Sequence, residues 1–178
     1  RDFNVVDRVL EQDYTLRQMR MAINERVMRM IATQHPVAVD LRKLFYLVHT
    51  ADEMERIGYQ AAGIGRAMMR EQYGKVPLLD DIFRMSERVG TMLERVLGED
   101  AEGMKAVLRM DDEVDVICEQ IYRECIARQG AHQVQDSETM TAISIAQYLE
   151  HVGDHAVNWA RWWLYFNGGP GENGDVIV

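Results

Sequence analysis

The sequence predicts an all-α protein, a tandem repeat of antiparallel three-helix bundles in which the first helix of repeat one is absent from this chain. Two observations predict this class. Apolar residues recur at helical spacing along most of the chain, and no convincing pair of strands with alternating polarity is visible. A set of short motifs also occurs twice, far apart in the sequence, as tandem copies of one helical unit do.

Prolines and glycines divide the chain into five predicted helices. Only three prolines occur, Pro36, Pro77 and Pro170, and each falls where a helical pattern stops, because proline lacks an N–H group and fixes φ. Glycine and short polar stretches mark the remaining breaks. The predicted helices cover 1–33, 37–71, 78–97, 101–129 and 137–166.

Each helix is justified by its own stripe of apolar residues, which in the first four helices are three, four or seven positions apart. Most of the twelve methionines fall on these stripes, and we expect them to fill the core. The long first, second and fifth helices favour an antiparallel bundle. In chain order the stripes contain Val9, Leu16, Ile23 and Met30; Val37, Leu41, Leu44 and Val48; Leu79, Ile82, Met85, Val89, Met92 and Val96; Val107, Val114 and Ile121; and Met140, Ile143, Val157, Trp159 and Trp162.

The repeat is visible in two pairs of segments. Residues 9–13 lie over residues 107–111 with an offset of 98, and residues 54–58 lie over residues 149–153 with an offset of 95. A shorter loop between the helices of the second copy explains the change of offset. The second copy has three helices and the first has only the last two, so a helix before Arg1 is predicted.

The repeats predict a division of the chain into two units and a tail. Residues 1–77 form the first repeat, incomplete at its N-terminus, and residues 78–167 form the second. Residues 168–178 form a flexible tail, because the segment that opens with Gly-Gly-Pro-Gly favours no regular structure.

Charge is distributed unequally between the two units. The net charge of −9 consists of +2 in residues 1–77 and −11 in residues 78–178, which argues against nucleic acid or an anionic membrane as the main partner. No apolar run is long enough to span a bilayer. Cys118 and Cys125, seven residues apart on one predicted helix, lie about 10 Å apart along it and form no disulfide, so the cytoplasm is the expected compartment.

Four acidic residues of the second repeat form pairs four positions apart, Asp111 with Asp115 and Glu150 with Asp154. Each pair lies on or beside an apolar stripe, so we expect all four side chains to point toward the bundle. Buried carboxylates must be protonated, paired or bound to metal, and this half has few basic residues. A cation such as Mg²⁺, Mn²⁺, Ca²⁺ or iron and a plain acidic face are both consistent with this pattern.

The first repeat departs from this pattern at two positions. Asp13 and Glu55 match the first acid of each pair, but Arg17 and Tyr59 replace the second acids. We hypothesise that Arg17 supplies, beside Asp13, Glu53 and Glu55, the positive charge that a metal supplies in the other repeat.

Several segments together resemble the PhoU family of phosphate-uptake regulators. They are the inter-helix segment Gln-His-Pro-Val-Ala-Val-Asp-Leu-Arg at 34–42, Glu-Arg-Ile-Gly at 55–58, Asp-Asp-Glu-Val-Asp at 111–115, and Tyr-Leu-Glu-His-Val-Gly-Asp-His-Ala-Val-Asn at 148–158. The resemblance covers about residues 1–166.

The resemblance implies both a fold and a function. It implies a pair of three-helix bundles whose acidic motifs bind multinuclear iron or another metal such as zinc or magnesium. Members of the family act at the cytoplasmic face of the phosphate ABC transporter, restrain its sensor histidine kinase when phosphate is plentiful, and often form homodimers. The expected partners are therefore the ATPase subunit of that transporter and the kinase, with membrane contact through proteins only and no nucleic acid.

The family's metal motif carries over to this chain by position, more completely in the second repeat than in the first. The residues carried over as metal ligands are Asp111, Asp115, Glu150 and Asp154, with weaker matches at Asp13, Glu53 and Glu55 and with Glu113, Glu119 and His155 as neighbours.

A non-enzymatic regulator is the leading interpretation, and two alternatives remain. One is a metal-binding helical module of a larger transporter or regulator, and the other is a carboxylate-metal storage protein or enzyme. No Glu-x-x-His motif of the di-iron bundles occurs, and no nucleophile elbow or phosphate-binding glycine loop is visible. We therefore expect no catalytic residues.

Overall fold

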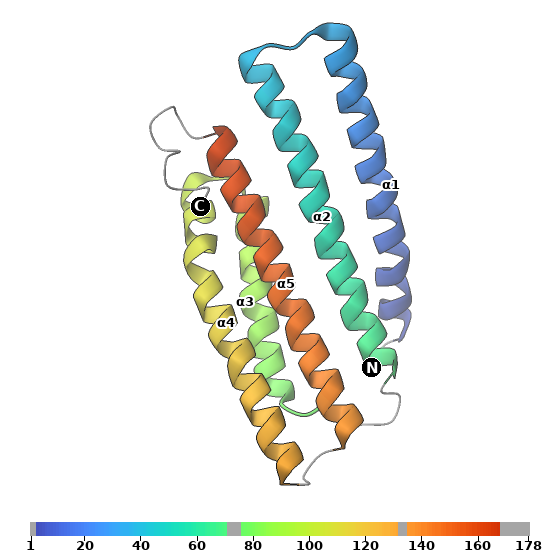
Figure 1. The fold of residues 1–178 in the computed structure, drawn as a ribbon, viewed down its shortest axis with the longest axis vertical. Helices are drawn as coiled ribbons and strands as arrows, with labels where there is room; N and C mark the ends of the chain where they lie inside the picture. The colour runs from blue at the N-terminus through green and yellow to red at the C-terminus, as the bar shows by residue number, and fades with distance from the viewer. Residues whose placement is uncertain (1–2, 71–75, 132–134, 168–178) are drawn as a thin grey trace.

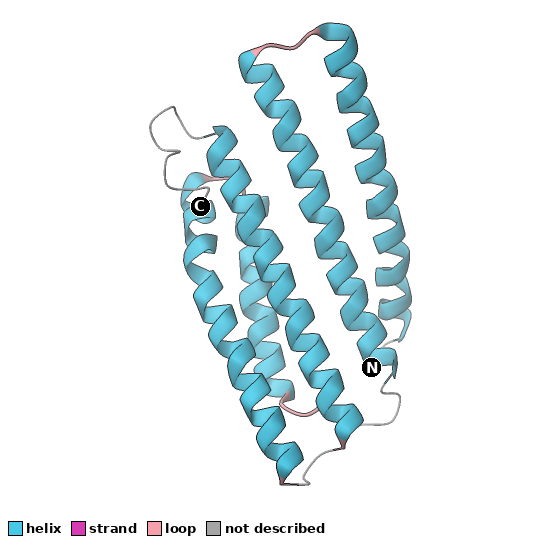
Figure 2. Ribbon diagram, in the orientation of Figure 1, coloured by secondary structure: helices cyan, strands magenta, loops and turns pink. Residues whose placement is uncertain are grey.

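The computed structural model describes residues 3–70, 76–131 and 135–167, and every regular element within them is an α-helix. The helices are α1 (Phe3–Gln34), α2 (Ala38–Arg70), α3 (Leu79–Leu97), α4 (Ala101–Gly130) and α5 (Asp136–Asn167). Figure 2 shows them as long rods joined by short connections. The all-α prediction is confirmed, and the ends of the five predicted helices differ from the observed ones by at most two residues.

Two helices at the centre hold the molecule together. In Figure 1, α2 and α5 lie side by side, α1 flanks α2, and α3 and α4 pack on α5 and on each other. The second repeat is therefore a three-helix bundle, whereas the described part of the first repeat is a helical pair. That the first repeat is incomplete, with a further helix before Arg1, stays a prediction.

The predicted boundary between the repeats falls in the connection between α2 and α3. Helix α2 ends at Arg70 and α3 begins at Leu79, so residue 77 lies between them. The division into 1–77 and 78–167 stays a prediction, and the predicted flexible tail at 168–178 lies outside the described residues.

The turn between α3 and α4 follows from its residues. Asp100 is the N-cap of α4, and its carboxylate accepts a hydrogen bond from the backbone N–H of Gly103 at 2.8 Å. A Cβ at position 103 would lie 2.9 Å from an Asp100 carboxylate oxygen, so glycine lets the cap approach closely. The short turn places α4 antiparallel to α3 and fixes where the acidic motif of α4 lies along the bundle.

The hydrophobic core lies mainly in the second repeat. Met85, Met92 and Met104 are fully buried there, between α3, α4 and α5. The prediction that methionines fill the core is right for these three and wrong for six others that are exposed. Five of those six lie on α1 and α2, which are the two helices described for the first repeat. The exposed methionines are Met19, Met21, Met28, Met30, Met54 and Met140.

The contact between the repeats combines close packing with polar bonds. Gly63 of α2 lies against the ring of Tyr148 on α5, where a Cβ would come within 2.5 Å of a ring carbon. The indole N–H of Trp159 donates a hydrogen bond to the Tyr46 hydroxyl at 3.1 Å. These contacts fix α2 against α5 and thereby fix the second repeat's acidic helices relative to the first repeat.

The described helices also bear on the predictions about membrane crossing and about the two cysteines. None of them contains an apolar stretch long enough to cross a membrane. Cys118 and Cys125 are both free and buried in α4, which confirms that this pair forms no disulfide.

Candidate functional site

The four carboxylates of the second repeat that match the family's metal motif lie on α4 and α5, which pack against each other. Asp111 and Glu150 are half-buried, but Asp115 and Asp154 are exposed. The expectation that all four point toward the bundle is therefore wrong for two of them. The second acid of each pair is rotated about 40° from the first, because four residues exceed one helical turn, and this rotation moves it to the flank of the stripe.

These carboxylates perturb one another. Burial, followed by the charges of Asp115 and Asp154, raises the pKa of Asp111 to about 6, although the Arg161 guanidinium acts in the opposite direction. The pKa of Glu150 is also raised, first by burial and then by the charge of Asp154. The pKa of Asp115 is raised in the same way. The cluster therefore holds more negative charge than its surroundings neutralise.

The donor chemistry of this cluster fits a cation that prefers oxygen ligands. In the described part of the chain, Asp111, Asp115 and Asp154 form no ion pair within 4 Å, and Glu150 contacts only His151, at 3.8 Å. The side-chain positions are not a closed ligand set, since no three acidic, histidine or cysteine side chains among the described residues gather closely enough to hold a metal. The cluster thus has the oxygen donors that such a cation prefers, but the described side chains do not converge on one point.

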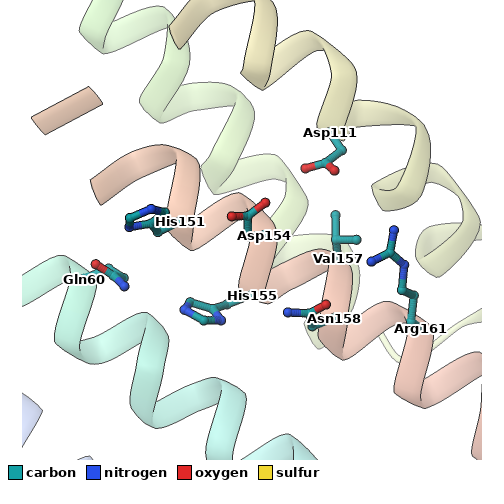
Figure 3. A pocket seen from close by; sticks show the side chains of 8 residues that line it. All are labelled: Gln60, Asp111, His151, Asp154, His155, Val157, Asn158 and Arg161. Atoms are coloured by element: carbon teal, nitrogen blue, oxygen red, sulfur yellow. The ribbon is translucent and has the colours of Figure 1, made fainter. Parts of the chain in front are cut away.

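A polar cavity of about 410 Å³ lies beside the cluster, between α2, α4 and α5 (Figure 3). Asp111 and Asp154 extend into it from facing helices, and Arg161 lies about two turns beyond Asp154 on α5. Of the other polar residues, His155 was expected from the sequence as a neighbour of the motif, but Gln60, Asn158 and Arg161 were not, because single amides and a lone arginine form no recognisable spacing. The cavity is lined by Gln60, Asp111, His151, Asp154, His155, Val157, Asn158 and Arg161.

The first repeat has ion pairs at the equivalent place. Arg17 contacts both Asp13, at 3.8 Å, and Glu55, at 3.5 Å. Arg20, which the sequence analysis missed, lies 2.5 Å from the second oxygen of Glu55 and 3.6 Å from Asp52. The structure therefore places Arg17 among these acids as hypothesised and adds a second guanidinium from the next turn of α1.

Glu53 lies apart from this group. It is 7% exposed, and its carboxylate lies 2.8 Å from Nδ1 of His155 on α5. The expectation that Arg17 lies beside Glu53 is therefore wrong, because Glu53 is two residues from Glu55 and so points to another side of α2. Glu53 and His155 instead form a buried polar contact between the repeats.

The remaining neighbours of the second-repeat cluster have partners of their own. Glu113 pairs with Arg88 of α3 at 3.5 Å, and Glu119 pairs with Arg123 one turn along α4. His151 faces Glu150 and the cavity. Asp111, Asp115, Glu150 and Asp154, by contrast, have no guanidinium or ammonium within 4 Å in the described residues.

The raised pKa of Asp111 predicts a pH-dependent difference between the wild type and Asp111→Asn in metal-free buffer. Between the ordinary pKa of 3.8 and the folded value of about 6, the folded protein binds the proton more tightly, so stability falls as pH rises through this window. At pH 7 we expect the asparagine variant to be more stable by about 1 kcal/mol, after allowance for solvent screening.

Urea unfolding at several pH values in EDTA measures this effect. The advantage of the variant should shrink as pH falls from 7 and should vanish near pH 4. A difference in stability that stays constant across this range would contradict the charge balance described for Asp111.

The fold and the two acidic clusters define a class of protein, a tandem helical repeat that carries carboxylate motifs on the last two helices of each unit. The family comparison identifies this class. The PhoU domain matches the chain over residues 1–68 and 82–163, one segment in each repeat, and the chain belongs to the PhoU family.

Relatives with assigned names share this family. The chain is 31% identical over 174 residues to the phosphate-specific transport system accessory protein PhoU of Serratia marcescens, covering 93% of this chain and 70% of that protein. The PhoU of Escherichia coli K12 is 30% identical over the same length, with the same coverage. The PhoU homolog of Clostridium acetobutylicum is 27% identical over 163 residues, covering 88% of this chain and 74% of that protein.

Solved structures agree with the fold. The crystal structure of PhoU from Pseudomonas aeruginosa superposes with a TM-score of 0.87 at 26% identity, covering 93% of this chain and 82% of that one. The PhoU from Streptococcus pneumoniae has the same fold, with a TM-score of 0.85 at 20% identity over 94% of this chain and 81% of that one.

Proposed function

We propose that this protein regulates phosphate uptake and phosphate-starvation signalling by contact with other proteins, without catalysis of its own. The observation that carries the proposal is the match of the PhoU domain to both repeats, in a chain whose relatives are named phosphate transport accessory proteins. Its partners in this proposal are the ATPase subunit of the phosphate ABC transporter and the associated sensor histidine kinase. It acts in the cytoplasm as a homodimer and reaches the membrane through these proteins.

Exposed apolar side chains on the first repeat support action by contact. Met19, Met21 and Met28 of α1 are more than half exposed, and Phe45 and Leu47 of α2 are nearly so, at 47% each. Exposed apolar residues on this helical pair favour a protein partner or a further helix, because their burial removes apolar surface from water.

The proposal includes a metal in the second repeat. Asp111, Asp115, Glu150 and Asp154 hold a divalent or trivalent ion, with iron, zinc and magnesium as candidates. The support is the raised pKa of Asp111, Asp115 and Glu150, which burial and, after it, the neighbouring carboxylates cause, because a nearby cation stabilises the charged form of each group. The ion then stabilises α4 against α5 and completes the shape of the acidic surface.

A binding experiment tests the partner. The purified chain is immobilised and exposed to the ATPase subunit of the phosphate transporter, with the ATPase subunit of an unrelated ABC importer as the matched control. We expect retention of the phosphate subunit and not of the control. If circular dichroism shows a folded chain and neither subunit is retained, or both are retained equally, the proposed contact is wrong.

The carboxylate cluster favours one other candidate function, a metal-binding module or store. A store binds many ions for each chain and a module of a larger protein binds few, whereas only the regulator requires the transporter contact. Elemental analysis combined with the binding experiment separates these cases. Many bound ions without transporter binding would favour storage over regulation.

A further inference from the structure

Two arginines lie inside the acidic cluster of the first repeat. Arg17 reaches one carboxylate oxygen of Glu55 and Arg20 reaches the other, so both oxygens have a guanidinium partner. Arg17 also reaches Asp13, and Arg20 reaches Asp52. The contact of Arg20 with Glu55 is an ion pair rather than an aligned hydrogen bond, since its Nε has no hydrogen-bond partner among the described residues. Together these pairs tie α1 to α2.

The second repeat carries different chemistry at the same positions. The offset of 98 residues places Arg17 over Asp115 and Arg20 over Cys118, which is a buried and free thiol. Where one repeat has two guanidiniums, the other therefore has a carboxylate and a neutral group. Burial and the nearby charges of Glu150 and Asp115 raise the pKa of Cys118, which keeps that thiol uncharged.

The first repeat also lacks an acid at the position of the second-repeat carboxylate Asp154 on α5. Asp154 corresponds to Tyr59, whose side chain is exposed. The Arg66 guanidinium lies over the ring of Tyr59, 5.3 Å from its centre, and donates a hydrogen bond to the Tyr59 carbonyl at 3.4 Å. An aromatic ring covered by a guanidinium thus stands in the first repeat where the second has the carboxylate of Asp154.

We propose that Arg17 and Arg20 take the place of a metal in the first repeat, so that this chain binds metal through its second repeat alone. The inference rests on the proposed function for the metal of the second repeat. The first cluster does not fit a cation, because a metal bound to Glu55 must displace two guanidiniums and then lie beside their positive charges.

One carboxylate oxygen of the cluster lacks a hydrogen-bond partner among the described residues. Oδ1 of Asp13 is buried and accepts no hydrogen bond from the described residues. A single oxygen is a poor site for a metal, because a metal needs several ligands. Asp13 lies at an apolar groove between the repeats, where water or another segment can donate a hydrogen bond to this oxygen. The unpartnered oxygen of Asp13 therefore does not turn the first-repeat cluster into a metal site.

Metal content in matched variants tests the proposal. Each protein is loaded with Mn²⁺, dialysed and measured by elemental analysis. Asp13→Asn/Glu55→Gln should keep the wild-type content, whereas Asp111→Asn/Glu150→Gln should lose nearly all of it. Arg17→Asp/Arg20→Ser/Tyr59→Asp, which gives the first repeat the charge pattern of the second, should roughly double the content.

The outcomes separate this inference from the proposed function. Loss of Mn²⁺ in Asp13→Asn/Glu55→Gln, or no gain in a folded triple variant, overturns the inference. A wild type without Mn²⁺ overturns the metal of the second repeat, which is part of the proposed function, and with it the contrast between the repeats.

Stability gives a readout that does not depend on metal loading. If the arginines act as the cation of the first repeat, Arg17→Gln/Arg20→Gln should lower the Tm by several degrees, and by the same amount with and without EDTA. A Tm loss that appears only in EDTA, or no loss, overturns the inference. Circular dichroism verifies the helical content of every variant.

Discussion

Replacing Gly63 with valine should destabilise the protein by about 2–3 kcal/mol, because the new side chain enters space that the ring of Tyr148 occupies. Three ring atoms of Tyr148 lie within 2.7 Å of the position of a Cβ at residue 63. The ring packs against the core of the second repeat, so it must move out of the contact between α2 and α5. Chemical denaturation measures the loss.

Gly90 provides the matched control for this substitution. It is also a helical glycine, in α3, but a Cβ there meets nothing within 4 Å. Gly90→Val should therefore stay within about 0.5 kcal/mol of the wild type. Removing the ring with Tyr148→Ala should make Gly63→Val much less harmful. Equal losses for the two glycine variants would mean that the contact between the repeats is not the cause.

Replacing Met92 with alanine should cost about 3 kcal/mol and should lower the Tm by about 6–12 °C. Met92 is fully buried in α3, and its side chain reaches the backbone of Gly153 on α5. The truncation leaves a cavity at the centre of the three-helix bundle. Met28→Ala in α1 is the control, because Met28 is 63% exposed, and it should change stability by less than about 0.5 kcal/mol.

These two methionines also show what the sequence could predict. The helices followed from the three prolines and the apolar stripes, because the period of a helix is a local property of the chain. The stripes could not reveal which apolar residues are buried, because burial depends on the helices that surround them. Met28 remains exposed because the described first repeat has two helices, whereas Met92 lies within three.

In the candidate site, too, spacing along the chain predicted some features, whereas contacts between distant residues could not be predicted. The offset of the repeat located the acidic pairs and the replacement by Arg17. Arg20 was missed because its equivalent, Cys118, belongs to no acidic motif and so gave no reason to compare the two. The contact of Glu53 with His155 joins residues 102 positions apart and depends on how α2 meets α5. No spacing within one helix predicts such a contact.

The unequal charge of the chain now has a structural description. The near-neutral first repeat pairs its acids with Arg17 and Arg20, which tie α1 to α2. The acidic second repeat leaves Asp111 and Glu150 half-buried with raised pKa values and with no guanidinium or ammonium within 4 Å in the described residues. In our account, one repeat is fixed by its own side chains and the other responds to a metal.

Anomalous scattering from crystals of the Mn²⁺-loaded protein tests this division most directly. We expect a peak between α4 and α5, within ligand distance of Asp111, Asp115, Glu150 or Asp154, and no peak between Asp13 and Glu55. A peak at Asp13 and Glu55, with Arg17 and Arg20 displaced, would mean that the arginines do not take the place of a metal.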